Sequence, residues 1–108
     1  MNDLIGFSVS FPDQETAHQA AYVLLEKKLI ARAHICPHES IYSWEGKINH
    51  DQEYTLSAKT EKSLVSEIEQ EIKTVHPNKI PGIYYFPIEA EHNYAQWTID
   101  SLKKNSRE

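Results

Sequence analysis

The chain has 108 residues, a net charge of −5 from 16 acidic and 11 basic side chains, and one cysteine. A chain of this length typically forms one domain, so we expect residues 1–108 to fold as a single unit. The acidic balance argues against sequence-independent nucleic-acid binding, which requires a basic face. No apolar run approaches the ~20 residues of a membrane span, and one cysteine forms no internal disulfide, so we expect a cytoplasmic protein.

The first half of the chain begins with a strand, a helix and a second strand. Apolar and small polar residues alternate over residues 4–11, which predicts a strand with one buried face. Asp13 is a favourable helix N-cap, and the alanine-rich spacing that follows it predicts a helix over residues 13–29. Residues 31–35 alternate again and predict a second strand. Pro37 should interrupt that strand, or mark a bend, a bulge or a sheet edge.

Residues 40–60 predict a long β-ribbon, and the rest of the fold is expected to be organised around it. Tyr42 and Trp44 alternate with polar residues, and a second alternating run follows at Tyr54, Leu56 and Ala58. Gly46 between the two runs suggests a bulge or a close backbone approach. Such a ribbon exceeds what one small sheet needs, so we expect it to reach another subunit. Trp44 should be buried against the sheet or against that neighbouring subunit.

The second half of the chain predicts a helix, a strand and a final helix. Thr60 is expected to cap a helix that runs to Val75, and a last strand is expected over residues 80–88. Asn93, with Gln96 three residues later, resembles a capping box at the start of the final helix. One face of that helix is expected to carry Tyr94, Trp97 and Leu102.

The resulting order of elements is β-α-β-β-α-β followed by a helix. This order predicts an α+β, ferredoxin-like fold in which an antiparallel sheet carries two helices on one face. Right-handed connections place both helices on the same face, so the other face is left uncovered within one chain.

Four segments resemble the CutA family of divalent-cation tolerance proteins. They are S-I-Y-S-W-E-G-K-I at 40–48, E-Y-T-L-S-A-K-T at 53–60, H-P-N-K-I-P-G-I at 76–83 and Y-A-Q-W at 94–97. The resemblance covers nearly the whole chain. It implies a ferredoxin-like fold with a long β-ribbon, a homotrimer like that of the PII signalling proteins, and a role in tolerance of copper, Cu(II), and other divalent cations.

Some positions depart from the pattern of that family. Gly82 stands where the family commonly has a carboxylate, and Val9 stands where some members have a cysteine. Of the ligand types proposed for the family, only His76 remains. A single imidazole makes a weak metal site, so we expect only weak Cu(II) or Zn(II) binding at His76 unless a neighbouring subunit adds ligands.

A second candidate metal site lies on the second strand. His34, Cys36 and His38 share one strand parity and would suit a soft divalent metal, provided that the strand bends at Pro37. The alternative for Cys36 is a buried thiol without chemistry, because it stands in an apolar strand context.

Two further function classes are a small-molecule sensor and an enzyme. Lys47, Lys59, Trp44 and His76 are candidates for binding a small molecule or an anion in clefts between subunits, as in a PII-like sensor. The sequence has no Gly-rich phosphate loop, no Cys-x-x-Cys, no His-Glu-x-x-His and no convincing acid–base or nucleophile set. We therefore expect no enzyme.

Overall fold

The computed structural model describes residues 4–103 of the chain. Its elements, in order, are β1 (Leu4–Phe11), α1 (Gln14–Glu26), β2 (Ala33–Trp44), β3 (Lys47–Glu61), a 3-10 turn (Lys62–Leu64), α2 (Val65–Val75), β4 (Ile83–Pro87) and α3 (His92–Ser101). The predicted order of elements is confirmed. Within residues 4–103, every helix is too short or too polar to cross a membrane.

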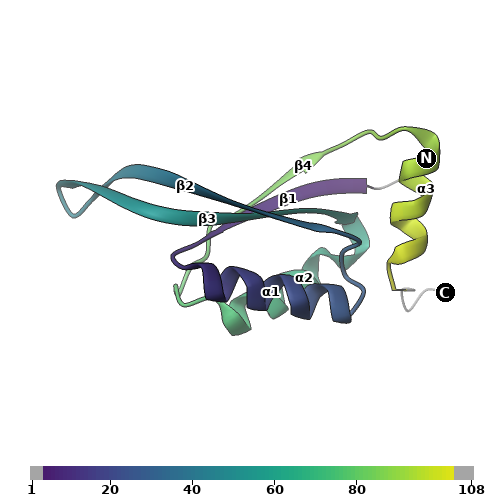
Figure 1. Ribbon diagram of the computed structural model, residues 1–108, viewed down its shortest axis with the longest axis horizontal. Coiled ribbons are helices and arrows are strands. Elements are labelled where there is room, and N and C mark those ends of the chain that lie inside the picture. The colour runs from purple at the N-terminus through teal and green to yellow at the C-terminus, as the bar shows by residue number, and fades with distance from the viewer. Residues whose placement is uncertain (1–3, 104–108) are drawn as a thin grey trace.

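The four strands form one sheet in the order β2-β3-β1-β4, and every neighbouring pair is antiparallel. β1 is therefore a central strand, while β2 and β4 are the edges. Helices α1 and α2 cover one face of this sheet, and α3 stands at the end of the sheet away from the ribbon tip (Figure 1). This arrangement is the predicted ferredoxin-like fold.

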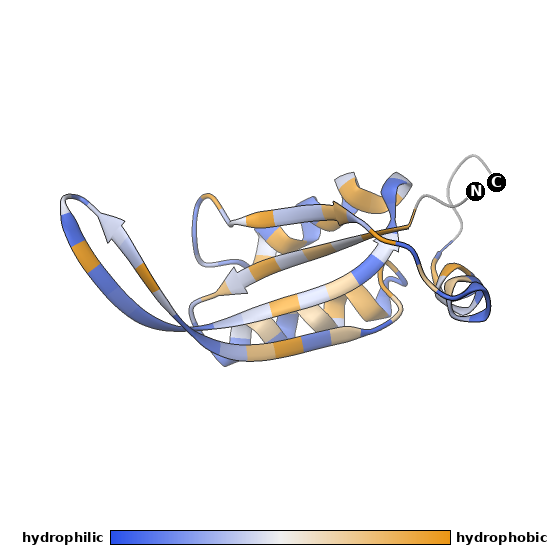
Figure 2. Ribbon diagram, turned by 90° about the horizontal axis from the view of Figure 1, so that it is seen from above, coloured by the Kyte–Doolittle hydropathy of each residue, from blue (hydrophilic) through white to orange (hydrophobic). Residues whose placement is uncertain are grey.

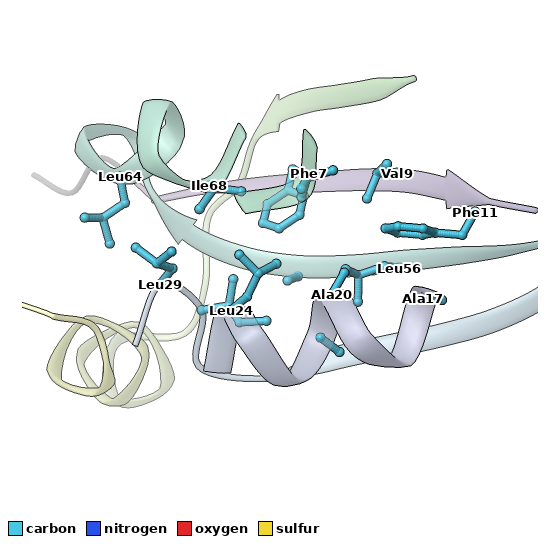
Figure 3. Packing of buried hydrophobic residues seen from close by; sticks show 14 of the residues in the cluster. Phe7, Val9, Phe11, Ala17, Ala20, Leu24, Leu29, Leu56, Leu64 and Ile68 are labelled. Atoms are coloured by element: carbon cyan, nitrogen blue, oxygen red, sulfur yellow. The ribbon is translucent and has the colours of Figure 1, made fainter. Parts of the chain in front are cut away.

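The core lies between the sheet and the two helices. Phe7, Val9 and Phe11 of β1 point towards α1, where they pack with Leu24, and Leu56 joins them from β3 (Figure 3). All of these side chains are almost completely removed from water. The alternation of apolar and polar residues in β1 thus directs one row of side chains into the core and the other row to the open face.

Strands β2 and β3 pair without interruption from Ala33↔Ala58 to Trp44↔Lys47. Pairing of β3 with β1 ends at Phe11↔Tyr54, so the outer half of the ribbon projects beyond the sheet (Figures 1 and 2). Glu45 and Gly46 both have positive φ angles, of 51° and 77°, and close the ribbon as a tight two-residue turn. Gly46 is therefore a turn residue. It marks neither of the expected features, a bulge or a close backbone approach, because a Cβ atom built there would meet no atom within 4 Å.

The predicted interruption at Pro37 is wrong. β2 runs straight through this residue, which pairs with Tyr54 in regular register. The edge position is the part of the expectation that is correct, because β2 is an edge strand. Proline lacks an N–H group, and an edge strand tolerates that loss on its outer side.

Thr60 does not cap the second helix. It pairs with Ile5 inside the sheet, and β3 continues to Glu61 before the 3-10 turn and α2 begin. Its hydroxyl is fully buried and donates to the carbonyl oxygen of Leu29 at 2.7 Å. Thr60 therefore ties the end of β3 to the connection between α1 and β2.

The predicted cap of the last helix is also wrong. Glu91 is the N-cap, and its carboxylate accepts a hydrogen bond from the backbone N–H of Tyr94 at 2.9 Å. Backbone hydrogen bonds from Asn93 and Tyr94 lower the pKa of Glu91. Gln96 does not reach back to the cap, because its amide donates to Asp100.

The two faces of α3 also differ from the prediction. Ala95 and Thr98 form its buried side, whereas Tyr94 and Trp97 are only partly covered and stack on each other with ring centroids 5.6 Å apart. Leu102 lies beyond the last helical residue and is buried in the core cluster. Leu102 therefore does not share a face with the two aromatic rings.

We predict that Thr60→Val lowers the free energy of unfolding by about 1–3 kcal/mol, because it leaves the buried carbonyl of Leu29 without a donor. The matched control is Thr74→Val. Thr74 makes the same kind of bond to Gln70 on an exposed face of α2, so its loss should cost under about 0.5 kcal/mol. Urea unfolding at one protein concentration measures both values. Equal losses for the two variants would contradict the assigned role of Thr60.

Candidate functional site

His76 ends helix α2 and is buried, with only 7% of its surface exposed. Its Nδ1 lies 3.0 Å from the backbone N–H of Asn78, and its Nε2 lies 2.7 Å from the carbonyl oxygen of Ser10. Because a backbone N–H only donates, Nδ1 accepts and Nε2 carries the proton that is donated to Ser10. The ring also stacks on Phe11 at 4.5 Å. A metal ion at His76 would therefore have to displace one of these hydrogen bonds.

The two other positions at which the family pattern departs are neighbours in the sheet region, because Val9 pairs with Ile83 and Gly82 precedes Ile83. Val9 is buried in the core facing the helices (Figure 3). Gly82 precedes β4, and a Cβ atom built there would meet no atom within 4 Å. Next to it is an open hollow of about 300 Å³ lined by Glu69, Lys73, Lys79, Ile80, Pro81 and Ile83.

The candidate ligands on β2 lie in one row on the open face of the sheet. Their cross-strand partners are Ser57 for His34, Thr55 for Cys36 and Glu53 for His38. Side chains two residues apart on a strand are separated by about 7 Å, so His34 and His38 are about 13 Å apart. Ligands of one metal ion lie about 2 Å from it, and the bend that would bring the three together is not formed. Across residues 4–103, no three His, Cys, Asp or Glu side chains are grouped to hold a metal ion.

The expectation that Cys36 is a buried thiol is wrong. Cys36 is free and exposed, because β2 is an edge strand and this side chain lies on the uncovered face. His38, in contrast, is engaged by its neighbours. Its Nε2 lies 2.5 Å from the hydroxyl of Thr55, and its Nδ1 lies 3.5 Å from that of Ser40, which donates to Glu53 at 2.6 Å.

The cleft candidates lie at opposite ends of the ribbon. Lys47 pairs with Trp44 beside the turn, and Trp44 is 64% exposed. Lys59 lies twelve residues further along β3, which corresponds to about 40 Å of strand. One chain therefore does not bring Lys47 and Lys59 to the same ligand. Trp44 is also not buried against its own sheet, so of the two places expected for it only a neighbouring subunit is left.

Two tyrosines on the sheet are held as hydrogen-bond donors. The hydroxyl of Tyr42 donates to Asp51 across the ribbon, which raises the pKa of Tyr42. Burial of Tyr85, together with its 2.5 Å hydrogen bond to Glu69, strongly raises the pKa of its phenol. Both phenols therefore keep their protons at neutral pH, and neither serves as a general base there.

A cluster at the base of the ribbon was not found from the sequence. The guanidinium of Arg32 lies 5.8 Å from the centre of the Trp97 ring. Beside it, Lys59 and His34 line a small hollow that Tyr94 of α3 closes. The signal in the sequence was the basic character of three separated residues. The pairing of β2 with β3 places His34 near Lys59 on the sheet, and α3 adds a wall of the hollow.

The chain matches known proteins over nearly its whole length. A family described as CutA1 divalent ion tolerance protein matches residues 5–101. The "Divalent-cation tolerance protein CutA" of Pyrococcus horikoshii is 36% identical over 96 residues, which cover 88% of this chain and 94% of that protein.

Solved structures agree with this match. CutA1 from Oryza sativa superimposes with a TM-score of 0.90 at 31% identity, over 94% of this chain and 95% of that chain. A protein from Archaeoglobus fulgidus, titled "Periplasmic divalent cation tolerance protein CutA", has a TM-score of 0.88 at 31% identity, over 93% of this chain and 99% of that chain. The extent of the match and the shared fold show that the chain belongs to the CutA1 divalent ion tolerance protein family.

Proposed function

We propose that this protein contributes to tolerance of divalent metal ions, copper among them, as a non-catalytic homotrimer in the cytoplasm. The observation that carries the proposal is membership of the CutA1 family over residues 5–101. Divalent-cation tolerance is the role that the name of the Pyrococcus horikoshii relative states for that protein.

The surface of a single chain supports the assembly. Tyr84 and Phe86 are exposed on β4, and Ile41, Trp44 and Ile48 are exposed near the ribbon tip. Both edge strands of the sheet also present unpaired backbone groups along part of their length. Cyclic closure of identical chains would cover these side chains and pair these edges. The projecting ribbon carries apolar side chains beyond the core of its own chain, and a neighbouring subunit would remove them from water.

The metal role depends on this assembly. His76 offers no unengaged ring nitrogen within its own chain, and the row on β2 does not converge. A tight site would therefore need donors from two or three subunits, whereas a site at His76 alone would be weak. Among the β2 residues, His34 and Cys36 are exposed and form the more accessible pair.

The alternative is a PII-like sensor that binds a small ligand in clefts between subunits. The observation that favours it is the position of Lys47 and Trp44 at the ribbon tip, remote from Lys59 of the same chain. A ribbon from one subunit would bring its tip beside the sheet of another, where Lys47 and Lys59 could face one ligand.

We predict that the protein has the mass of a trimer in light scattering at micromolar concentration, and that Trp44→Ala weakens it. Truncation of a large side chain buried between subunits should cost roughly 3–5 kcal/mol of stability. Tyr22→Ala is the matched control, because Tyr22 is a similarly exposed aromatic residue that lies on α1, outside the ribbon, and it should leave mass and melting unchanged. A monomer mass for the wild type, or unchanged melting and mass in Trp44→Ala, would contradict the assembly.

We predict that calorimetric titration with Cu(II) or Zn(II) gives binding weaker than micromolar, and that His76→Ala and Cys36→Ser change it only modestly. His18→Ala, which removes an exposed imidazole on α1, is the control for unspecific binding. If His76→Ala abolishes a micromolar or tighter site, neighbouring subunits supply ligands at His76. If only Cys36→Ser abolishes it, the site lies on β2. Tight ATP binding without metal binding would favour the sensor instead.

A further inference from the structure

We propose that the hollow between α3 and the end of the sheet binds a small phosphate-type oxyanion. We call this site the basic hollow and define it by Arg32, His34, Ser57, Lys59 and Tyr94. It lies at the end of the sheet opposite the ribbon tip, where α3 stands (Figure 1). His34 is also a candidate metal ligand, and Lys59 is also a candidate for the cleft between subunits. An oxyanion is a different class of ligand from a divalent cation.

Four separate segments build the basic hollow. Arg32 lies in the connection between α1 and β2, and His34 lies near the start of β2. His34 is directly opposite Ser57 of β3, and Lys59 follows on the same face of that strand. Tyr94 of α3 closes the remaining side. The register of β2 and β3 therefore places His34 and Lys59 near each other. The packing of α3 adds Tyr94 as a further wall of the hollow.

The charges of Arg32 and Lys59 in the basic hollow are not neutralised by an ion pair among residues 4–103. The protein carries 16 acidic and 11 basic residues, so carboxylates outnumber cations over the whole sequence. The ion pairs among residues 4–103 are Lys27–Glu71, His50–Glu39 and Lys103–Glu67. Arg32 and Lys59 take part in none of these, and Glu61, two residues from Lys59 on the same strand, pairs with neither. Two uncompensated cations on one wall repel each other, and an anion between them would remove that cost.

Arg32 contacts an aromatic ring and makes no hydrogen bond through its guanidinium to any residue of 4–103. Its guanidinium lies 5.8 Å from the Trp97 ring, which in turn stacks on Tyr94 at an interplanar angle of 18°. This cation–π contact orients the planar fork and leaves its N–H groups for a ligand. The hydroxyl of Ser57 likewise has no hydrogen-bond partner among the described residues. The donors needed to hold an oxyanion are therefore present before it arrives.

The size of the cavity defines the class of ligand. Its volume of about 10 Å³ admits one water molecule or one oxygen atom. A tetrahedral oxyanion would insert a single oxygen, while its other oxygens stay at the mouth, within reach of the Arg32 fork and the Lys59 ammonium. Arginine recognises such oxygens in pairs, and lysine adds a point charge. The cavity is too small to enclose a nucleoside or a large organic anion.

The test uses inorganic phosphate as the probe and the full chain in its native assembly, at constant ionic strength. Calorimetry should show saturable binding to the wild type. Arg32→Gln and Lys59→Gln should each weaken it about tenfold or more, the value of one charge-assisted hydrogen bond. Arg32→Lys keeps the charge but loses the fork, and it should give a smaller loss. Lys47→Gln makes the same change of charge at the ribbon tip and should leave the affinity unchanged.

Three results would overturn the proposal. The first is absence of saturable phosphate binding to the wild type. The second is an equal loss in Lys47→Gln, because phosphate would then respond only to the net charge. The third comes from light scattering of the same variants. If Arg32→Gln or Lys59→Gln dissociates the assembly and phosphate does not bind, the two cations serve a carboxylate of a neighbouring subunit and not an oxyanion.

Discussion

The central strand β1 imposes the constraint on which the rest of the structure depends. It is paired on both sides, so its side chains have only the two faces of the sheet available. Phe7, Val9 and Phe11 occupy one face and require cover from α1 and α2, whereas Ser8 and Ser10 on the other face require none. The same strand also fixes the end of α2, because Phe11 stacks on His76 and Ser10 accepts its hydrogen bond. The alternating residues of β1 thus determine which side chains form the core, which face of the sheet the helices cover, and where the His76 ring lies.

The opposite face of the sheet follows from this arrangement. It carries hydroxyl, imidazole, thiol and ammonium groups on β1, β2 and β3, and of the described helices only α3 lies against it, at one end. Such a face is stable in water but is bounded by two edge strands and by exposed aromatic residues of β4. The fold therefore satisfies its core within one chain and leaves a face of mixed polar and aromatic side chains open.

The sequence predicted the strands and helices that have a periodic pattern of apolar residues. It did not predict the hydrogen bonds between side chains and backbone groups that are distant in the sequence. The alternation in residues 4–11 and in the ribbon gave the correct strands, and the order of elements gave the correct fold. Local capping signals failed at Thr60 and Asn93. The hydroxyl of Thr60 is taken by Leu29, 31 residues earlier, and the cap of α3 is supplied by Glu91. For the candidate site, the shared parity of His34, Cys36 and His38 was correct. The hydrogen-bond partners of His76 could not be predicted from the residues around it, because one of them, Ser10, lies 66 residues away in the sequence.

The hydrogen bonds of His76 and His38 limit the metal site that a single chain can form. An imidazole binds a metal ion through an unprotonated ring nitrogen, so each ring nitrogen that already accepts or donates a hydrogen bond must first give up that bond. His76 uses both of its nitrogens on backbone groups, and His38 has hydroxyl groups next to both of its own. These rings hold strands and a helix end together, and removing them costs stability whether or not metal is present. Of the candidate ligands His34, Cys36, His38 and His76, the first two lie exposed on an edge strand, and two ligands alone do not hold a metal ion tightly.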